Sequence, residues 1–211
     1  MKIEYFGHAC FKITDKNGVS VVTDPYTGIG YELPKNFTAD IVTVSHSHFD
    51  HNYIAGVSGN PQIITDKSTK TVKGIEIEGI ASWHDNKQGL LRGENRIYKI
   101  AADGITLCHL GDLGEDISQT LVDKIGKTDI LCIPIGGTYT INASQAKAYI
   151  QAIQPKMVIP MHYKSADCTI DITDEKPFLR LFDGVKYAIG NEVEIEEFTK
   201  DMQIVFMTRE K

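Results

Sequence analysis

The sequence predicts a single α/β domain with mixed sheets, and three observations support this prediction. Short apolar runs separated by turn residues fill the first half of the chain, whereas helix-like and strand-like segments alternate after residue 112. The length of 211 residues lies within the range of one large domain with a sizeable core. The composition, with 42% apolar and 24% charged residues, is that of a globular protein, so a disordered or fibrous chain is excluded.

The chain opens with three predicted strands at residues 2–6, 10–14 and 19–23. Each is a short apolar run, and the turn sequence DKNG at residues 15–18 separates the second run from the third. Consecutive strands with such short connections pair with their neighbours, so we expect a β-meander.

Further strands are predicted in the middle of the chain. A looser stretch at residues 24–36 leads to the apolar run 40–46, which stops at a cluster of His and Asp residues. The runs at 61–66, 74–82 and 95–112 are again apolar segments with short connections, as expected for strands of a sheet.

The pattern changes to alternating helices and strands in the second half. Residues 117–126 and 143–154 space their apolar side chains by three and four positions, as a helix packed on one face does. Asn142 followed by Gln145 is an N-cap pair for the second helix. A short apolar strand follows each predicted helix, and this alternation predicts helices that cover a sheet.

The last part of the chain is predicted to close the fold. Residues 175–184 have the pattern of a short helix, and residues 192–198 and 202–207 have that of strands. No linker-like tract, low-complexity segment or short-period repeat interrupts the chain. We therefore expect residues 1–211 to form one domain.

The charge balance limits the classes of partner. The 28 acidic and 22 basic residues give a net charge of −6 without a long Lys/Arg run, so we expect neither nucleic acid nor an anionic membrane as partner. A small-molecule substrate is expected, nucleotides included, and the oligomeric state stays open. The N-terminus lacks the pattern of a secretory signal and no stretch of 18 apolar residues occurs, so we expect a cytoplasmic location.

The four cysteines are predicted to be buried free thiols. They occur singly at positions 10, 108, 132 and 168 without a CxxC pair, and three of them lie in apolar strand-like runs. Isolated cysteines in such runs pack as small apolar side chains more often than they form disulfides.

The seven histidines indicate the chemistry, because three of them fall within six residues directly after a predicted strand. His46 and His48 can point to the same side of an extended segment, and a turn can bring Asp50 and His51 to a neighbouring position. A catalytic zinc site takes about four ligands and keeps one position for water. Four ligand-type side chains in one segment therefore predict parts of two adjacent metal sites more naturally than one complete site.

Further metal ligands are predicted at the ends of other strand-like runs. His84, Asp112 and His162 each follow such a run. Sites in α/β folds collect where strands give way to loops. One isolated His in this setting is more often a hydrogen-bonded, half-buried side chain, but the whole group beside the 46–51 cluster favours metal binding.

Together these motifs resemble the metallo-β-lactamase superfamily. The HxHxDH run at 46–51, His84, the Gly-Asp of HLGDLG and the His of IPMHY occur in the order and at the separations typical of it. The segments GHACFKI, TDPY, GGTYT and IPMHYKS are similar to the branch of ascorbate-6-phosphate lactonase-like proteins and uncharacterised metal-dependent hydrolases. The resemblance spans residues 3–165 and implies a four-layer αββα sandwich with the site at one edge between the sheets.

The resemblance also implies two divalent metal ions and their ligands. The first ion would be held by His46, His48 and His84, the second by Asp50, His51 and His162, and Asp112 would bridge them. Two metal ions about 3.5–4 Å apart share a water, lower its pKa and polarise a carbonyl or phosphoryl oxygen. The bridging hydroxide would attack the substrate, with Asp50 and Asp112 acting in catalysis. The imidazole-rich set favours zinc, and manganese or iron also suits it.

Three residues near these motifs have alternative interpretations. Asp24 resembles a family position that supports the HxHxDH loop, but it can equally start a turn before Pro25. His109 competes with His84 as third ligand of the first site; we favour His84 and keep His109 as a candidate catalytic residue beside the ligands. His8 is predicted to line the site floor or donate a proton, with simple packing as the alternative.

Other residues of the motifs have weaker predictions. Tyr139 and Lys164 can bind a substrate anion or protonate a leaving group, although a solvated Lys is the more common state. The two glycines of GGTYT indicate a sharp turn rather than a phosphate-binding loop, because the chain contains neither a Walker nor a GxGxxG motif. Ser45 and Ser47 are not expected to be nucleophiles, since metal ions can activate water.

The sequence therefore predicts a metal-dependent hydrolase that cleaves a small ester, lactone or phosphoester. The alternative is a phosphodiesterase that acts on RNA or nucleotides, but related nucleases carry an added RNA-clamping part for which 211 residues leave little room. A diiron redox protein is disfavoured, because related diiron flavoproteins usually carry Glu in place of His48 and a flavodoxin-like domain. The complete ligand set is evidence against a metal sensor without activity.

Overall fold

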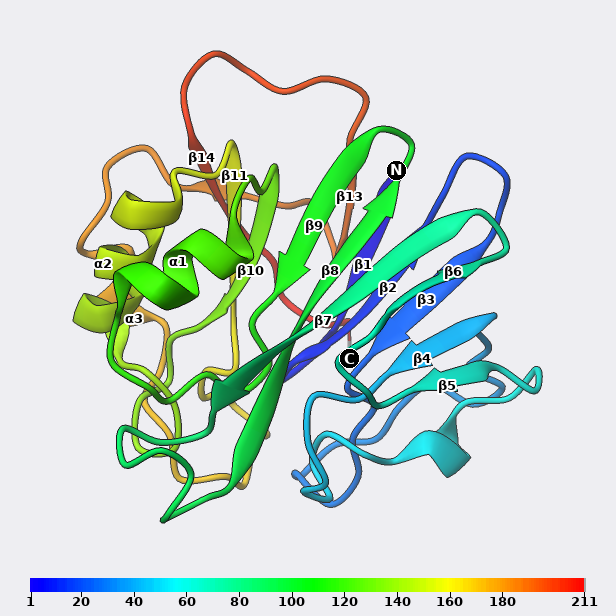
Figure 1. Ribbon diagram of the computed structural model, residues 1–211, viewed down its shortest axis with the longest axis horizontal. Coiled ribbons are helices and arrows are strands. Elements are labelled where there is room, and N and C mark those ends of the chain that lie inside the picture. The colour runs from blue at the N-terminus through cyan, green and yellow to red at the C-terminus, as the bar shows by residue number, and fades with distance from the viewer. Residues whose placement is uncertain (211) are drawn as a thin grey trace.

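Two mixed β-sheets packed against each other form the centre of the fold, and helices cover one of them (Figure 1). The computed structural model describes residues 1–210. This arrangement is the α/β sandwich that the sequence predicts.

The first sheet has six strands and begins as the predicted β-meander. In spatial order they are β13 (Glu192–Glu194), β1 (Lys2–Gly7), β2 (Cys10–Thr14), β3 (Ser20–Thr23), β4 (Ile41–Thr43) and β5 (Gln62–Ile64). β1, β2 and β3 pair antiparallel, with Lys2 opposite Thr14 and Thr14 opposite Ser20. The chain then crosses over, so that β4 and β5 continue parallel to β3.

The second sheet has eight strands. In spatial order they are β12 (Lys186–Tyr187), β14 (Gln203–Phe206), β11 (Met157–Met161), β10 (Ile130–Pro134), β9 (Ile105–His109), β8 (Glu94–Ala102), β7 (Ile75–Trp83) and β6 (Thr69–Val72). β6 to β9 pair antiparallel as successive hairpins, whereas β9, β10, β11 and β14 pair parallel. The sequence pattern does not predict β6 or β12, because both are short and mostly polar.

Helices in the connections between the parallel strands cover the outer face of the second sheet (Figure 1). α1 (Gln119–Ile125) and α2 (Ala143–Ile153) lie within the predicted helical segments. The Asn142 side chain accepts hydrogen bonds at the start of α2, and the Gln145 side chain accepts one from the Asn142 backbone. This capping box confirms the predicted N-cap pair. The short helix α3 (Lys176–Leu179) lies inside the predicted segment 175–184.

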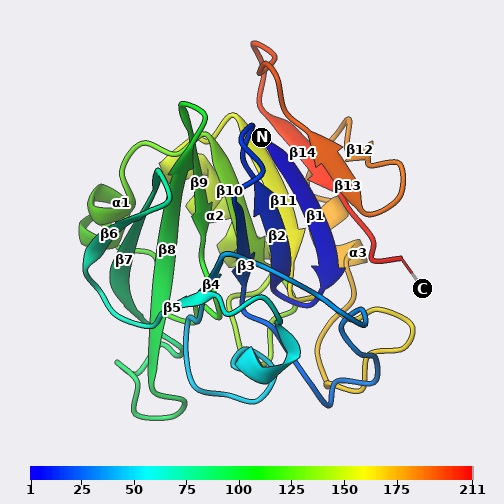
Figure 2. The ribbon, with the colours of Figure 1, turned by 90° about the vertical axis from the view of Figure 1, so that its right-hand side faces the viewer.

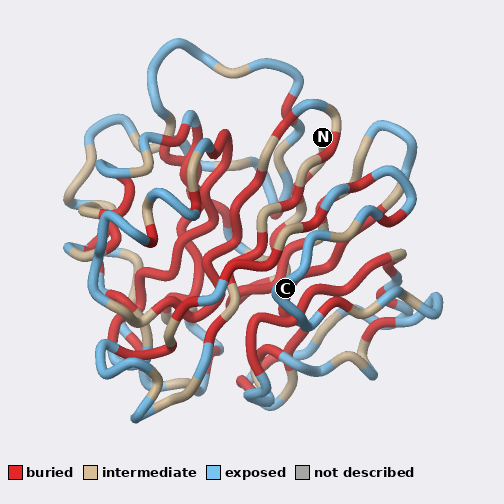
Figure 3. Tube along the Cα trace, viewed as in Figure 1, coloured by how far each residue is buried: buried red, intermediate tan, exposed pale blue. Residues whose placement is uncertain are grey.

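The core lies between the two sheets. Ile3 and Tyr5 of β1 belong to the same hydrophobic cluster as Ile75 and Ile77 of β7, and each of these side chains is at most 2% exposed. Figure 3 shows the buried segments along the strands and the exposed segments along the loops. The four cysteines are buried and free, as predicted. No helix within residues 1–210 is long and apolar enough to cross a bilayer.

The outer side of the first sheet differs from the expected αββα layering. Within residues 1–210 this side is covered by loops and the 3₁₀ helix η1 (Ile54–Gly56) rather than by α-helices (Figure 2). Tyr26 and Phe37 of the loop 24–40 pack on Val42 of β4 in a second hydrophobic cluster. This loop contains two Pro and two Gly with positive φ, which disfavour a helix, so the fourth layer is a loop layer.

Candidate metal centre

Histidine and aspartate side chains converge at one edge of the sandwich, where loops leave the strands. His8 follows β1, the 46–51 segment follows β4, His84 follows β7, Asp112 follows β9 and His162 follows β11. Within the first sheet β1 and β4 run in the same direction, and within the second sheet β7, β9 and β11 do so, so in each sheet the strands end at one edge. The side chains form three overlapping groups, and within each group the potential ligand atoms lie within 4.8 Å of one another.

The first group consists of His46, His48 and His84. His46 Nε2 lies 3.0 Å from His48 Nδ1, and the ring centres of His46 and His84 are 4.6 Å apart. His46 and His84 are buried, whereas His48 is exposed. The structure thus brings together the three imidazoles predicted for one metal ion, with His48 on the solvent side.

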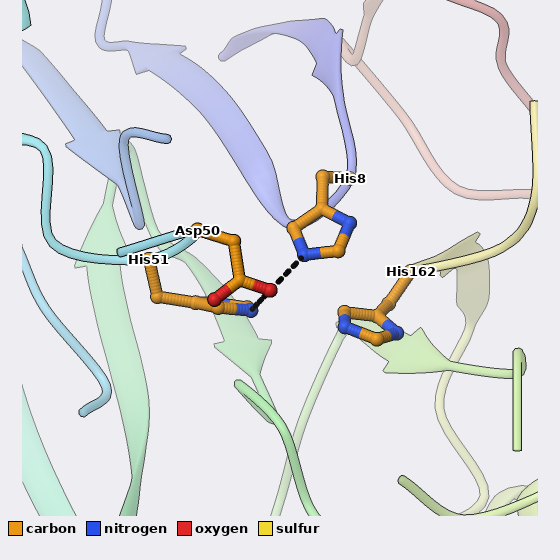
Figure 4. Close-up of side chains that lie close together, drawn as sticks. All are labelled: His8, Asp50, His51 and His162. Carbon is orange, nitrogen blue, oxygen red and sulfur yellow. Dashed lines mark hydrogen bonds and ion pairs between the residues drawn. The ribbon is translucent and has the colours of Figure 1, made fainter. Parts of the chain in front are cut away.

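The second group consists of Asp50, His51, His162 and His8 (Figure 4). His8 Nε2 lies 3.1 Å from Asp50 Oδ2, and the ring centre of His8 lies 4.1 Å from that of His162. His8 occupies the turn between β1 and β2 in the left-handed conformation, with φ 56°, and its side chain is buried. Three of these residues are the predicted set, and His8 joins them as part of the same group.

Asp112 lies between the two groups and contacts both. Its Oδ1 is 3.1 Å from His51 Nε2, and its Oδ2 is 3.3 Å from both His84 Nε2 and His162 Nε2. His46 Nε2 is 3.9 Å from the same Oδ2. Oδ2 therefore faces both groups and Oδ1 faces the second, so this one carboxylate is placed to act as a bridging ligand.

Asp24 orients two of the histidines through hydrogen bonds. Its carboxylate is fully buried; His51 Nδ1 donates to Oδ2 over 2.9 Å, and Ser45 Oγ donates to the same oxygen over 2.6 Å. His46 Nδ1 lies 2.9 Å from Ser45 Oγ and donates to it. Both imidazoles therefore carry their proton on Nδ1 and present Nε2 to the centre. These contacts support the interpretation of Asp24 as the residue that holds the HxHxDH loop.

Two buried atoms at the centre have the environment of cation ligands. His51 Nε2 and Asp112 Oδ1 lie 3.1 Å apart, and neither forms a hydrogen bond within residues 1–210. Two facing lone pairs repel at this distance unless a positive charge lies with them. Imidazole nitrogens and carboxylate oxygens are ligands of zinc, manganese and iron, so the residues fit divalent metal ions.

The environment keeps two of the imidazoles neutral. Burial lowers the pKa of His46 to about 2, and the nearby His51 adds to this effect. Burial likewise lowers the pKa of His8 to about 4, with His162 adding to the effect. Neutral imidazole is the form that binds metal ions, so His46 needs no deprotonation at neutral pH.

In His51 and Asp112, neighbouring charges outweigh the effect of burial on the pKa. Burial alone would lower the pKa of His51, but the carboxylates of Asp112 and Asp24 outweigh burial and raise it well above the usual value. Burial alone would raise the pKa of Asp112, but His162 and His51 outweigh it and lower the pKa well below the usual value. The site therefore attracts a positive charge between these two side chains, and a metal ion at His51 Nε2 would take the place of a proton.

His109 is not part of any of the metal-binding groups within residues 1–210. Its Nε2 donates to the backbone oxygen of Ala9 over 2.8 Å, and its Nδ1 accepts from the backbone N–H of Gly111 over 3.2 Å. Both ring nitrogens of His109 thus have backbone partners, and these contacts favour His84 over His109 as third ligand of the first group.

A cavity of about 580 Å³ opens over the candidate metal ligands. His48, Asp50, His84 and Asp112 form part of its wall. Tyr139 also lines it, as the prediction of a substrate-facing residue requires. The remaining lining residues are Phe49, Arg92, Thr169, Ile170 and Asp171. The sequence does not mark them as site residues, because four of them are not of a metal-ligand type and Asp171 does not belong to a motif.

Lys164 and the two glycines of GGTYT have other surroundings. Lys164 Nζ donates to the backbone oxygen of Ile170 over 2.5 Å and lines a different cavity, so it does not face the metal ligands. A Cβ at Gly136 would lie 2.2 Å from the backbone oxygen of His162. Gly137 has φ 61°, as in the predicted sharp turn. Gly136 is thus required for the close approach of its loop to a metal-ligand candidate.

Comparison with known families identifies one match that covers most of the chain. The family model described as "Beta-lactamase superfamily domain" matches residues 2–162. The matched range contains all of the side chains that form the centre.

Similar proteins occur among solved structures and curated sequences. A structure from Thermotoga maritima, a candidate zinc-dependent hydrolase of the metallo-β-lactamase superfamily, is 38% identical with a TM-score of 0.83, covering 98% of this chain and 97% of that one. A UPF0173 metal-dependent hydrolase from Thermoplasma acidophilum is 27% identical over 97% of this chain and 99% of its own length. One from Methanospirillum hungatei is 30% identical over 79% of this chain and 84% of its own.

Proposed function

This chain belongs to the metallo-β-lactamase superfamily, and we propose that it is a hydrolase that uses two divalent metal ions to cleave a small ester, lactone or phosphoester. The observation that carries this proposal is the position of Asp112. Its two oxygens lie within 3.3 Å of imidazole nitrogens from His51, His84 and His162, which belong to both ligand groups. A single structural site would not need a carboxylate shared between two groups.

The two groups give each metal ion its own ligands. His46, His48 and His84 would hold one ion, and Asp50, His51 and His162 the other, with Asp112 between them. Zinc is our first candidate, because imidazole nitrogens form most of the set; manganese or iron also suits imidazole with carboxylate. The metal-dependent hydrolases among the similar proteins support a metal-dependent reaction, and the zinc-dependent hydrolase named for one of them supports zinc.

When bound, the two cations would activate a water molecule as nucleophile and polarise the bond to be cleaved. The chain has no need of a protein nucleophile at this position. The Ser45 hydroxyl donates a hydrogen bond to Asp24, and Ser45 is not among the residues that line the cavity. Ser45 therefore acts in orienting His46 rather than in attacking the substrate.

His8 and Tyr139 have separate proposed roles in the reaction. Asp50 is ionised, because His8 and His51 outweigh burial and keep its pKa below the usual value, so His8 Nε2 donates to Asp50 Oδ2. This bond orients the Asp50 carboxylate, which would be one of the ligands of the second ion. Tyr139 lines the cavity, and we propose that its hydroxyl protonates the leaving group.

The test is a substrate screen on metal-reconstituted protein with matched variants. The panel contains phosphorylated sugars, lactones, simple esters and cyclic nucleotides, each assayed with zinc and with manganese. His48→Ala removes an exposed ligand, whereas Asn52→Ala changes an exposed side chain of the same loop that forms no hydrogen bond within residues 1–210. We expect turnover of at least one substrate class that His48→Ala abolishes and Asn52→Ala retains.

Two outcomes would contradict the proposal. Turnover that His48→Ala leaves intact would show that the reaction does not use the metal centre. Iron-dependent oxygen consumption without hydrolysis would show that a redox reaction occurs instead.

A further inference from the structure

The cavity above the metal ligands contains a single basic side chain. Of the residues that line it, all within the described range, Arg92 is the only Lys or Arg. Phe49, Ile170 and Tyr139 provide apolar surface in the same wall. A substrate bound in this cavity therefore has one guanidinium in the wall around it.

Arg92 has unused hydrogen-bond donors. Its Nη2 donates to the backbone oxygen of Thr138 over 3.1 Å, and its guanidinium carbon lies 5.5 Å from the ring centre of Tyr139. No carboxylate within residues 1–210 forms an ion pair with it. A guanidinium has five N–H donors in a planar fork that fits carboxylate and phosphate oxygens. A half-buried guanidinium with free donors can bind such a group through charge-assisted hydrogen bonds.

The loop that carries Arg92 is fixed rather than flexible at its base. Asp85 is 2% exposed, and its carboxylate accepts four backbone N–H groups of this loop. Oδ1 accepts from Lys87 over 2.7 Å and Gly89 over 3.0 Å, and Oδ2 accepts from Leu91 over 2.9 Å and Arg92 over 2.7 Å. Asp85 directly follows the metal-ligand candidate His84. The same short segment therefore sets the position of Arg92 relative to the metal centre.

We infer that Arg92 is a specificity-determining residue that binds a carboxylate or phosphate group of the substrate, at a point separate from the bond that is cleaved. This inference rests on the proposed function, since the metal ions would bind the reacting end. Phe49 and Ile170 fit a short apolar spacer between the two ends. Asp171 in the same wall disfavours a second anionic group on its side, so the substrate carries its negative group toward Arg92.

The test compares binding of dicarboxylates with monocarboxylates of the same chain length. Succinate, glutarate and adipate, with butyrate, valerate and hexanoate, are titrated calorimetrically into zinc-reconstituted protein. Both members of a pair offer one carboxylate to the metal ions, so the difference between them reports the second site. We expect at least one dicarboxylate to bind about tenfold more tightly than its partner, as one charge-assisted hydrogen-bond pair provides.

Three variants test whether Arg92 causes the preference for dicarboxylates. Arg92→Gln is expected to remove the preference, and Arg92→Lys is expected to retain part of it. Lys87→Gln removes the same charge from an exposed position of the same loop and is the matched control, which should keep the full preference. Thermal melts show that each variant is folded.

The outcomes separate the two proposals. No dicarboxylate preference in the unchanged protein, or a preference that survives Arg92→Gln, would overturn the anion site even if the substrate screen finds turnover. An Arg92-dependent preference without turnover of any ester, lactone or phosphoester would support the anion site and overturn the hydrolase proposal.

Discussion

Asp24 and His51, which are 27 positions apart in sequence, form a hydrogen bond of 2.9 Å between a carboxylate oxygen and Nδ1. Both side chains are fully buried. Because Asp24 holds the imidazole proton on Nδ1, His51 Nε2 is left to face Asp112 at the centre. The arrangement of the candidate ligands therefore depends on Asp24, which lies outside the candidate metal-binding groups among residues 1–210.

Asp24→Asn should weaken metal binding, although the Asn side chain has nearly the same size and shape as that of Asp. The amide can donate a hydrogen bond where the carboxylate only accepts, so His51 loses its fixed tautomer and Ser45 loses its acceptor. Removing such a partner of a metal ligand typically costs about 10–100-fold in metal affinity. Competition with a chromophoric chelator measures the dissociation constants.

Asp40→Asn is the matched control for Asp24→Asn. Asp40 Oδ2 also accepts from a serine, with Ser20 N at 2.9 Å and Ser20 Oγ at 3.2 Å, but it is remote from the centre. Equal losses of metal affinity in both variants would mean that the effect is general destabilisation rather than loss of ligand orientation.

His109→Gln should lower stability without changing metal content. Ala9 O and Gly111 N would lose partners in a fully buried position, at a cost of about 1–3 kcal/mol for each group left without one. His84→Gln should instead reduce metal content. Urea unfolding and elemental analysis of both variants measure the two effects, and loss of metal in the His109 variant alone would exchange the roles of these histidines.

Asp85→Asn should destabilise the loop that carries Arg92. The amide nitrogen of Asn would face backbone N–H groups that now donate hydrogen bonds to the carboxylate. The donors left without an acceptor would lower the free energy of unfolding by about 1–3 kcal/mol. For a chain of this size the melting temperature falls by about 2–4 °C per kcal/mol. Asp15→Asn is a suitable control, because Asp15 accepts two backbone N–H groups in a turn remote from the centre. We expect only the Asp85 variant to lose the dicarboxylate preference.

Asp129 should contribute a pH-dependent part of the stability. Burial would raise the pKa of this carboxyl, but the hydrogen bonds from Lys156 Nζ at 2.8 Å and the backbone of Thr106 at 2.9 Å outweigh burial and lower the pKa below 3.8. A lowered folded-state pKa stabilises the fold above the unfolded-state pKa, and this contribution is lost as the pH falls through the folded-state value.

The measurement for Asp129 is the melting temperature of the wild-type protein and of Asp129→Asn between pH 3 and pH 8. The difference between them should be constant near neutral pH and should shrink below about pH 4, where the unfolded-state carboxyl protonates. A difference that grows on acidification would contradict this account. Because both proteins share the metal centre, its own titration affects the two curves alike.

The local part of the centre was predictable from the sequence, and the long-range part was not. His46, His48, Asp50 and His51 lie in one segment, so their spacing alone indicates a shared site. The end of a strand-like run marks His84, Asp112 and His162 as further ligands, because strand ends collect at a sheet edge.

Contacts between distant segments could not be predicted in this way. His8 and Asp50 are 42 positions apart, and only the pairing of β1 with its sheet and a left-handed turn bring them together. His109 has the same local setting as a ligand, but its ring nitrogens bind backbone groups that the sequence does not place. Arg92 has no motif of its own, and its position follows from the hydrogen bonds of Asp85.

The layers of the fold were likewise predictable only in part. Apolar runs and the Asn142 cap predict the strands and helices of the sandwich, and these are confirmed. The outer layer over the first sheet was expected to be helical from the resemblance alone. The Pro and Gly residues of the loop 24–40 disfavour a helix in this layer.

The most direct test of the central claim is anomalous diffraction from crystals of the zinc-reconstituted protein, recorded on both sides of the zinc absorption edge. We expect two zinc peaks, one among His46, His48 and His84 and one among Asp50, His51 and His162, with Asp112 in contact with both. A single peak, or peaks outside these groups, would contradict the two-metal centre.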